Sequence, residues 1–297
     1  DTGWEHADTY EHVDNLARWL DIDIERHGHV VDLPERLLAD AEAVEAALGL
    51  NRPSAFARLC LKKGIFPRRT VRFCTQSLKI FVVQDLVRKM HAVGQIPVNA
   101  IGIRAAESVA RSKLTETEIS PTLDCMIWRP LIRWTEADVV DIHRRNGVRM
   151  NPLYARGAER VGCYPCIMAA KSEIRMAGRD PQRMEAIRLL EAAVQKSHFA
   201  RAEAKGETSE RPPTLFTASR RDASGDRPGI GIDDVIAWAK TARGASVDQV
   251  AMFDDPEDPD AGCMRWGMCE QAPSADPSDV AEGIEASDHA RPSEGKQ

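Results

Sequence analysis

The sequence predicts an α/β protein with a mostly parallel, doubly wound sheet and a helical, cysteine-bearing C-terminal extension. Three observations lead to this prediction. Apolar, β-rich runs alternate with amphipathic helical segments over residues 1–147, which we take as the α/β core. Residues 148–270 are rich in loops and helices and carry a C-x-x-C pair, which marks the extension. Residues 271–297 are acidic and rich in Pro and Ser, which predicts a disordered tail.

The chain begins with Asp1-Thr2-Gly3, which is typical of a turn at the end of a strand. A helix should follow at once, because Thr9 can cap it and four apolar residues share one helical face: Val13, Leu16, Ala17 and Leu20. A turn running into a helix normally follows a buried strand in α/β units. We therefore expect that the strand preceding Asp1 is missing from this chain.

The next elements are mainly helical. Residues 25–33 form either a short strand or a loop, and helices are predicted over 35–48, 54–63 and 75–94. Gly64 and Gly94 end the last two of these helices, since glycine readily takes the left-handed conformation found there.

Two buried strands are predicted over residues 96–103 and 123–132, each followed by a helix. The first helix spans 104–114, and the second spans 135–147 with a capping-box start. Two further helices, over 180–200 and 232–244, belong to the extension.

The net charge of −6 hides an asymmetry along the chain. Residues 254–297 carry 12 acids and 3 bases, whereas residues 1–253 carry 34 acids and 37 bases. This mildly basic body suits small anionic ligands and lacks the strongly basic stripe of a dedicated nucleic-acid binder. No apolar run reaches the roughly 18 residues of a membrane span.

Seven cysteines occur in the sequence, and this odd number argues against a disulfide framework. We expect a reducing, cytoplasmic location with metal-binding or reactive thiols. Cys163 and Cys166 have C-x-x-C spacing, and Cys263 and Cys269 follow much later. These four can form a four-thiolate site for zinc or an iron–sulfur cluster, although a C-x-x-C pair alone can also be a redox pair. Cys60 and Cys125 lie in apolar segments and are expected to be inert core residues.

Two stretches could bind anions. In GIRAAESVARSKL, Arg104, Ser108 and Arg111 follow a predicted strand and can form a phosphate or sulfate clamp, or simply be surface residues of a solvated helix. In RRTVRFCTQSLK, three arginines precede Cys74 and Lys79 at a helix start, which would stabilise a thiolate or a bound anion. Cys74 could equally be a buried structural cysteine beside a solvated basic loop.

Four motifs occur in a fixed order: DTGWEH, R-x-C-T-x-x-L-K, G-I-R-A-x-E-S-x-x-R, and W-x-P-L-x-x-W-T continuing through NPLY to VGCYPC. With these motifs the chain resembles the phosphoadenosine phosphosulfate (PAPS) reductase family of the adenine-nucleotide α-hydrolase-like superfamily. It is most similar to the phage-like and DNA-phosphorothioation-type branch. The resemblance covers residues 1–175 closely and continues more loosely to Glu270. It implies a Rossmann-like sheet of the adenine-nucleotide α-hydrolase type.

The resemblance also implies nucleotide contacts. In the family, a first strand runs into a Ser-Gly-Gly-x-Asp-Ser phosphate loop before the D-T-G turn, so we expect this chain to be a fragment that lacks the first β-α-β unit. Asp1, Thr2 and Gly3 would lie near the adenosine. The phosphate- and sulfate-contacting positions would be Lys79, Gly102, Arg104, Ser108 and Arg111.

The family match further implies a metal site. Cys74, Cys163 and Cys166 occupy positions that hold a [4Fe–4S] cluster in cluster-bearing members, with zinc as the alternative metal here. Those members often take the fourth ligand from a Cys-Cys pair, but Thr75 follows Cys74 in this chain. The fourth ligand is therefore expected to be Cys269, or alternatively Cys263.

The implied activity is that of a PAPS reductase-like enzyme acting on sulfur. Family reductases attack the sulfonate with the cysteine of a C-terminal Glu-Cys-Gly-Leu-His element, which is absent here. Cys263 and Cys269 are the candidate catalytic cysteines that remain. The reaction would be either reduction of PAPS to sulfite and adenosine 3',5'-bisphosphate, or nucleotide-driven sulfur transfer.

Two alternatives stay open: an ATP-pyrophosphatase-type sulfurtransferase, and a non-catalytic, metal-stapled module that binds nucleotide or associates with DNA. The expected partners are PAPS or ATP and a thioredoxin-like reductant or sulfur donor. Neither direct nucleic-acid binding nor a membrane is indicated.

Overall fold

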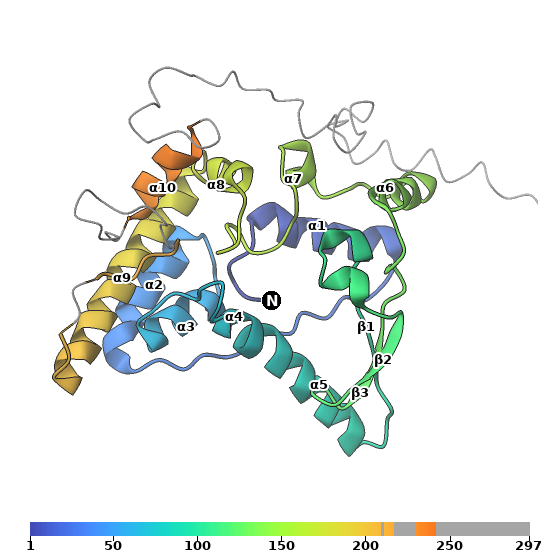
Figure 1. Cartoon of the computed structure of the whole chain (residues 1–297), viewed down its shortest axis with the longest axis horizontal. Coiled ribbons are helices and arrows are strands. Elements are labelled where there is room, and N and C mark those ends of the chain that lie inside the picture. The colour runs from blue at the N-terminus through green and yellow to red at the C-terminus, as the bar shows by residue number, and fades with distance from the viewer. Residues whose placement is uncertain (209–210, 217–229, 242–297) are drawn as a thin grey trace, which may run out of the picture.

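The computed structural model describes residues 1–208, 211–216 and 230–241, and over these residues the chain folds as an α/β protein with a small sheet (Figure 1). Helices form most of the described structure. Two of them, α4 (Phe73–Thr75) and α5 (Phe81–Ala92), are joined by a π-helical turn over Gln76–Ile80. The helices are α1 (Ala7–Leu20), α2 (Leu38–Ala47), α3 (Ala55–Lys63), α4 (Phe73–Thr75), α5 (Phe81–Ala92), α6 (Glu136–Arg145), α7 (Pro152–Ala155), α8 (Lys171–Ala177), α9 (Pro181–Lys205) and α10 (Ile232–Ala239).

The sheet of the described residues has three short strands in the order β1-β3-β2. β1 (Val98–Ala100) runs parallel to β3 (Cys125–Trp128), and β2 (Thr117–Ser120) runs antiparallel to β3. The sheet is therefore mixed, and the expected mostly parallel arrangement is reduced here to one parallel pair. The sequence prediction missed β2, because Ile119 is the only large apolar residue in that strand and gives no alternating pattern.

The first predicted strand is shorter and more exposed than expected. Residues 96–103 contain only the three-residue β1, and Val98 remains 47% exposed. Its partner β3 confirms the second predicted strand and alternates between buried and exposed residues.

The helix predicted over residues 104–114 is wrong. The structure has two 3-10 turns there, Ala105–Glu107 and Arg111–Lys113. Ser108 separates them with an extended backbone, and its hydroxyl accepts a hydrogen bond from the Arg111 N–H at 3.2 Å. A serine side chain that bonds to a nearby backbone amide competes with helical hydrogen bonding, which explains the break.

The remaining helix predictions are largely confirmed. Ser54 caps α3 and Gly64 ends it in the left-handed conformation, as the sequence predicts. Thr135 and Asp138 form the predicted capping box of α6. The cap of α1 differs, because His6, three residues before Thr9, accepts the hydrogen bond from the Asp8 N–H. The chain between α1 and Pro34 forms a loop without a strand.

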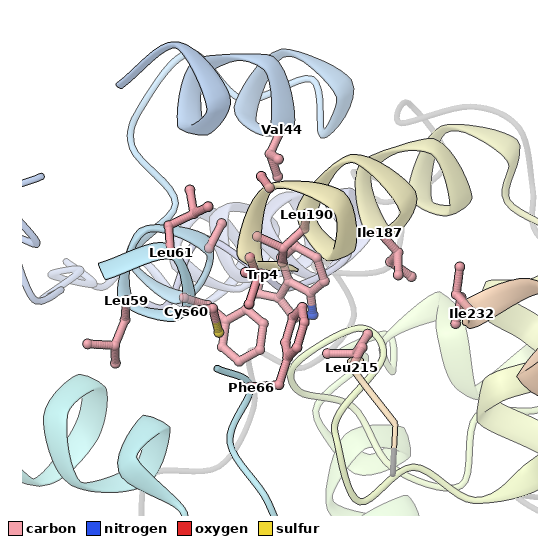
Figure 2. Close-up of a cluster of buried hydrophobic side chains, with 14 of the residues drawn as sticks. Trp4, Val44, Leu59, Cys60, Leu61, Phe66, Ile187, Leu190, Leu215 and Ile232 are labelled. Atoms are coloured by element: carbon pink, nitrogen blue, oxygen red, sulfur yellow. The ribbon is translucent and has the colours of Figure 1, made fainter. Parts of the chain in front are cut away.

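One hydrophobic core joins the helices of both halves of the chain. α9 packs along α2 and α3 on the side of the molecule away from the sheet (Figure 1). Figure 2 shows side chains from these helices meeting Trp4, which is fully buried and lies at the end of the N-terminal turn. The core side chains with essentially no exposure include Trp4, Val44, Leu61, Ile187, Leu190 and Val194.

Candidate functional site

The Asp1-Thr2-Gly3 turn is fixed by its contact with the start of α3. Gly3 has a φ of +66°, and a Cβ atom there would lie 2.6 Å from the Ser54 Cα, so only glycine fits without displacement. The Ser54 hydroxyl donates to the Gly3 carbonyl at 2.7 Å, and the Phe56 N–H donates to the Thr2 carbonyl at 2.9 Å. These contacts hold the turn rigidly against the core.

The same turn lies directly against the predicted cysteine loop. Glu5 and Cys163 form an isolated antiparallel bridge, and the Tyr164 N–H donates to the Trp4 carbonyl at 2.9 Å. The Thr2 hydroxyl lies 3.9 Å from the Cys163 sulfur. The fold therefore brings together two predicted site segments that are about 160 residues apart in the sequence.

A buried polar network extends from this contact. Thr2 donates to Glu5 at 2.6 Å, and the Tyr10 hydroxyl lies within hydrogen-bonding reach of both Glu5 and Asp1. Arg52 pairs with the Asp1 carboxylate. Burial alone would raise the pKa of Glu5, but the hydrogen bonds from Thr2, Tyr10 and the Trp4 backbone outweigh it, so the pKa lies below its ordinary value. Glu5 is therefore a carboxylate held next to Cys163.

Arg183 of α9 joins this network from the extension. Its guanidinium lies 5.1 Å from the centroid of Trp4 and 5.3 Å from that of Tyr164, and it donates to the Glu5 carbonyl at 2.9 Å. The residue is only 6% exposed, and its Nη1 has no hydrogen-bond partner in the described part of the chain. The sequence analysis missed Tyr10, Arg52 and Arg183, because no motif or spacing marks them. It gave Glu5 no role, although Glu5 lies within the DTGWEH motif.

Three predicted metal ligands gather near Lys79. The Lys79 ammonium acts on the pKa values of both Cys74 and Cys163, and Cys163 and Cys166 line the same small pocket. Burial raises the pKa of Cys74, while Thr75 and Lys79 oppose that rise. Burial also raises the pKa of Cys163, and the nearby Glu5 carboxylate adds to it. The uncharged thiols are thus favoured in the absence of a cation.

The metal site at these thiols stays a prediction. Within residues 1–208, 211–216 and 230–241, no three His, Cys, Asp or Glu side chains are grouped to hold a metal ion. Both of the predicted metal groups, zinc and an iron–sulfur cluster, use cysteine thiolates as ligands. Cys263 and Cys269, the predicted fourth ligand and catalytic residues, lie outside the described residues.

The predicted anion clamp lies on the two 3-10 turns after β1. The Arg104 side chain is 16% exposed, and its Nε is buried without a hydrogen-bond partner among the described residues. Arg111 pairs with Glu107, and Ser108 is exposed between the two arginines. Gly102 lies in the preceding bend, where a Cβ would only touch Leu131 at 3.8 Å.

Tyr154 of α7 lies between the predicted anion clamp and the cysteine loop, close to Arg104 and hydrogen-bonded to the backbone of Val161. Burial raises the pKa of Tyr154, and the Arg104 charge lowers it in part, so the two side chains are close. Tyr154 also forms a hydrogen bond with the backbone of Val161. A small pocket beside this segment is lined by Leu153, Val161, Cys163, Tyr164, Cys166 and Met176. The anion clamp and the cysteines thus flank the same part of the fold.

Comparison with known proteins gives this arrangement a family. The phosphoadenosine phosphosulfate reductase domain matches residues 32–169, which include the predicted clamp and all three described metal-ligand positions. An uncharacterized 37.8 kDa protein of Escherichia phage 186 is 31% identical over 275 residues, covering 83% of this chain and 80% of its own length. The chain belongs to the PAPS reductase family.

Several similar proteins are named adenosine 5'-phosphosulfate reductases. The one from Burkholderia cepacia is 31% identical over 179 residues, which are 60% of this chain and 62% of that protein. The one from Rhizobium tropici is 28% identical over 180 residues, which are 60% of this chain and 86% of that protein. This PAPS reductase family member therefore aligns over about 60% of its length with proteins named for a sulfated adenine nucleotide. Among its described residues, no helix is long and apolar enough to cross a membrane.

Proposed function

We propose that this protein binds an adenine nucleotide between the Asp1–Gly3 turn and the Arg104–Arg111 segment and acts on sulfur beside the cysteines. One observation supports this most: the Thr2 hydroxyl lies 3.9 Å from the Cys163 sulfur. A residue expected near the adenosine and a residue expected in the metal site are therefore neighbours. A nucleotide held at that turn would have its phosphate groups close to the cysteine neighbourhood.

Each side chain has a distinct role in this proposal. Arg104 offers a buried guanidinium with an unpartnered Nε, so a phosphate or sulfate oxygen can accept its hydrogen bonds. Lys79 places a positive charge near Cys74 and Cys163, which favours both a thiolate and a developing negative charge. Thr2 and Glu5 fix the orientation of the cysteine loop.

We also propose a [4Fe–4S] cluster held by Cys74, Cys163 and Cys166, with Cys269 or Cys263 as the fourth ligand. These positions match the ones that hold a cluster in cluster-bearing members of the family, and zinc is the alternative metal. When bound, the cluster would supply a concentrated charge next to the nucleotide site, and it would order the cysteine loop. The protein's own residues would bind and orient the substrate.

The reaction that suits these residues is thiol-dependent reduction of a sulfonucleotide. A thiolate of Cys269 or Cys263 would attack the sulfonate sulfur and form a sulfur–sulfur bond, while the bond from sulfur to the phosphate oxygen breaks. The nucleotide would leave as adenosine 3',5'-bisphosphate from PAPS. A thioredoxin-like dithiol would then release sulfite, and its two thiols would be oxidised to a disulfide.

ATP-dependent sulfur transfer is the second candidate, because the chain lacks the Glu-Cys-Gly-Leu-His element of the family reductases. In that reaction the protein would adenylate an acceptor with release of pyrophosphate, and sulfur from a donor would then displace AMP from the acceptor. The two reactions differ in substrate and product, so one product analysis separates them.

The test uses anaerobically purified protein of full natural length with PAPS, adenosine 5'-phosphosulfate or ATP. Reduction predicts sulfite in the presence of thioredoxin and dithiothreitol, and its loss in the Cys269→Ser and Cys263→Ser double variant. Sulfur transfer predicts pyrophosphate from ATP and no sulfite. A protein that binds nucleotide but yields neither product would instead support a non-catalytic binding module.

A further inference from the structure

The two arginines of the anion clamp share one carboxylate. Glu107 forms an ion pair with Arg111, and its Oε1 lies 3.9 Å from the Arg104 Nε. Glu136 approaches Arg104 from α6, with 3.9 Å between its Oε1 and the Arg104 Nη2. Both separations from Arg104 are too long for hydrogen bonds. The Arg111 Nη1 is thus paired with Glu107. Arg104 has negative charges nearby, but its Nε has no hydrogen-bond partner among the described residues.

These four side chains have no net charge together. An arriving phosphate or sulfate dianion therefore gains little from long-range attraction, and it has to compete with Glu107 for the Arg111 Nη1. The Glu107 side chain is 26% exposed and belongs to the last residue of a short 3-10 turn, so it can rotate into solvent without a change of the backbone. Only two methylene groups join the carboxylate to the backbone of the same loop, which gives it a high effective concentration at Arg111.

We propose that Glu107 is a specificity-determining residue that reserves the Arg104–Arg111 clamp for nucleotide-linked phosphate or sulfate groups. This inference rests on the proposed function, because it takes the clamp as the nucleotide's anion site. A free inorganic dianion has only its own contacts with which to displace Glu107. A nucleotide also gains contacts between its adenosine and the N-terminal turn, so it can displace the carboxylate at a lower concentration.

The test measures binding of inorganic phosphate and sulfate by isothermal titration at constant ionic strength. Glu107→Gln removes the competing charge and keeps the size of the side chain. Glu116→Gln is the matched control, since Glu116 is exposed nearby and makes the same change in net charge. Adenosine 5'-phosphosulfate, PAPS and ATP are titrated in parallel, and thermal melts check that the variants fold.

We expect Glu107→Gln to bind phosphate and sulfate about three- to fivefold more tightly than wild type, in line with the loss of an exposed ion pair. The affinity for nucleotide should rise by less, so the preference for nucleotide over inorganic anion falls. Glu116→Gln should change neither affinity by more than about 1.5-fold, because Glu116 is exposed to screening solvent and no ion pair among the described residues joins it to Arg104 or Arg111.

Equal affinities for phosphate in the two variants would overturn the inference, as would no increase in Glu107→Gln. The proposed function fails in a different way, namely if wild type binds none of the three nucleotides. If Glu107→Gln binds phosphate more tightly but no nucleotide binds, Glu107 still competes with anions at this site. The natural ligand of the site is then not a nucleotide. If wild type binds nucleotide and Glu107→Gln changes neither nucleotide nor phosphate affinity, only the proposed role of Glu107 is refuted and the proposed function stands.

Discussion

Glu191 joins α9 to the segment 211–216 and to the start of α10, and its replacement gives the sharpest prediction for stability. This α9 residue is 6% exposed, and its two carboxylate oxygens accept hydrogen bonds from the Leu215 N–H at 2.9 Å and the Ile232 N–H at 3.0 Å. The first donor belongs to the segment 211–216, and the second begins α10. One side chain thus anchors two segments that are separate in the sequence.

Glu191→Ala leaves both buried amides without a partner. Each unsatisfied donor costs about 1–3 kcal/mol, so the free energy of unfolding should fall by about 2–5 kcal/mol. In a protein of this size the melting temperature should then fall by roughly 5–15 °C. Glu191→Gln keeps one acceptor oxygen and turns an N–H₂ group toward the other amide, so it should cost about 1–2 kcal/mol.

The pH dependence of this effect has a definite sign. Burial raises the pKa of Glu191 above its ordinary value of 4.5, although the two amide hydrogen bonds partly oppose it. The folded state therefore holds the proton more tightly than the unfolded state. The stability gained from this group is present below the unfolded pKa and is lost as the pH rises through the folded pKa. The advantage of wild type over Glu191→Gln should thus shrink as the pH rises from about 4.5.

The assay is urea unfolding of wild type and the two variants, followed by circular dichroism at several pH values. Glu185→Ala is the control on the same helix, because its carboxylate is 56% exposed and forms an ion pair with Arg188 at the surface. It should change the free energy of unfolding by less than about 0.5 kcal/mol. If Glu191→Ala costs no more than this control, the anchoring role of Glu191 is wrong.

Three further predictions concern the metal, the turn and the tail. Protein purified without oxygen should be brown with a broad visible band and contain iron, and Cys163→Ser should lose both; colourless protein free of iron and zinc would contradict the metal site. Gly3→Ala should lower the free energy of unfolding by more than about 2 kcal/mol, because the new Cβ would lie 2.6 Å from the Ser54 Cα; an unchanged melting temperature would show that the turn is not fixed. Truncation after Glu270 should leave the melting temperature almost unchanged, since residues 271–297 hold few large apolar groups to offset the cost of ordering; a fall of several degrees would show that the tail docks.

Local signals in the sequence predicted most of the helices well. Ser54 before α3, Gly64 after it and the Thr135–Asp138 box act through nearby backbone groups, so their effect can be read from neighbouring residues. Cys60 and Cys125 are buried as predicted, because apolar sequence context reports burial well. The strands were harder to predict, since β2 gains its order from pairing with β3 and not from its own composition.

The sequence predicted the site residues that lie in motifs. It missed the residues that only tertiary contacts bring into the site. The Asp1–Gly3 turn and the Cys163–Cys166 pair were both marked in the sequence, but only the fold shows that they touch. Nothing in the sequence singles out Arg183, because its helix has charged residues throughout. Arg183 is buried against the rings of Trp4 and Tyr164, and Trp4 lies more than a hundred residues away in the sequence. No local sequence pattern can predict a contact over that separation.

Binding of adenosine 5'-phosphosulfate and PAPS by wild type and Arg104→Ala tests the central claim most directly. Arg104 is largely buried with an unpartnered Nε, so a bound oxyanion should gain a charge-assisted hydrogen bond of about 1.5–3 kcal/mol. Isothermal titration on protein of full natural length should therefore show binding that Arg104→Ala weakens about ten- to a hundredfold, with an unchanged melting temperature. Equal affinity in the two proteins, or no binding by wild type, would contradict the account.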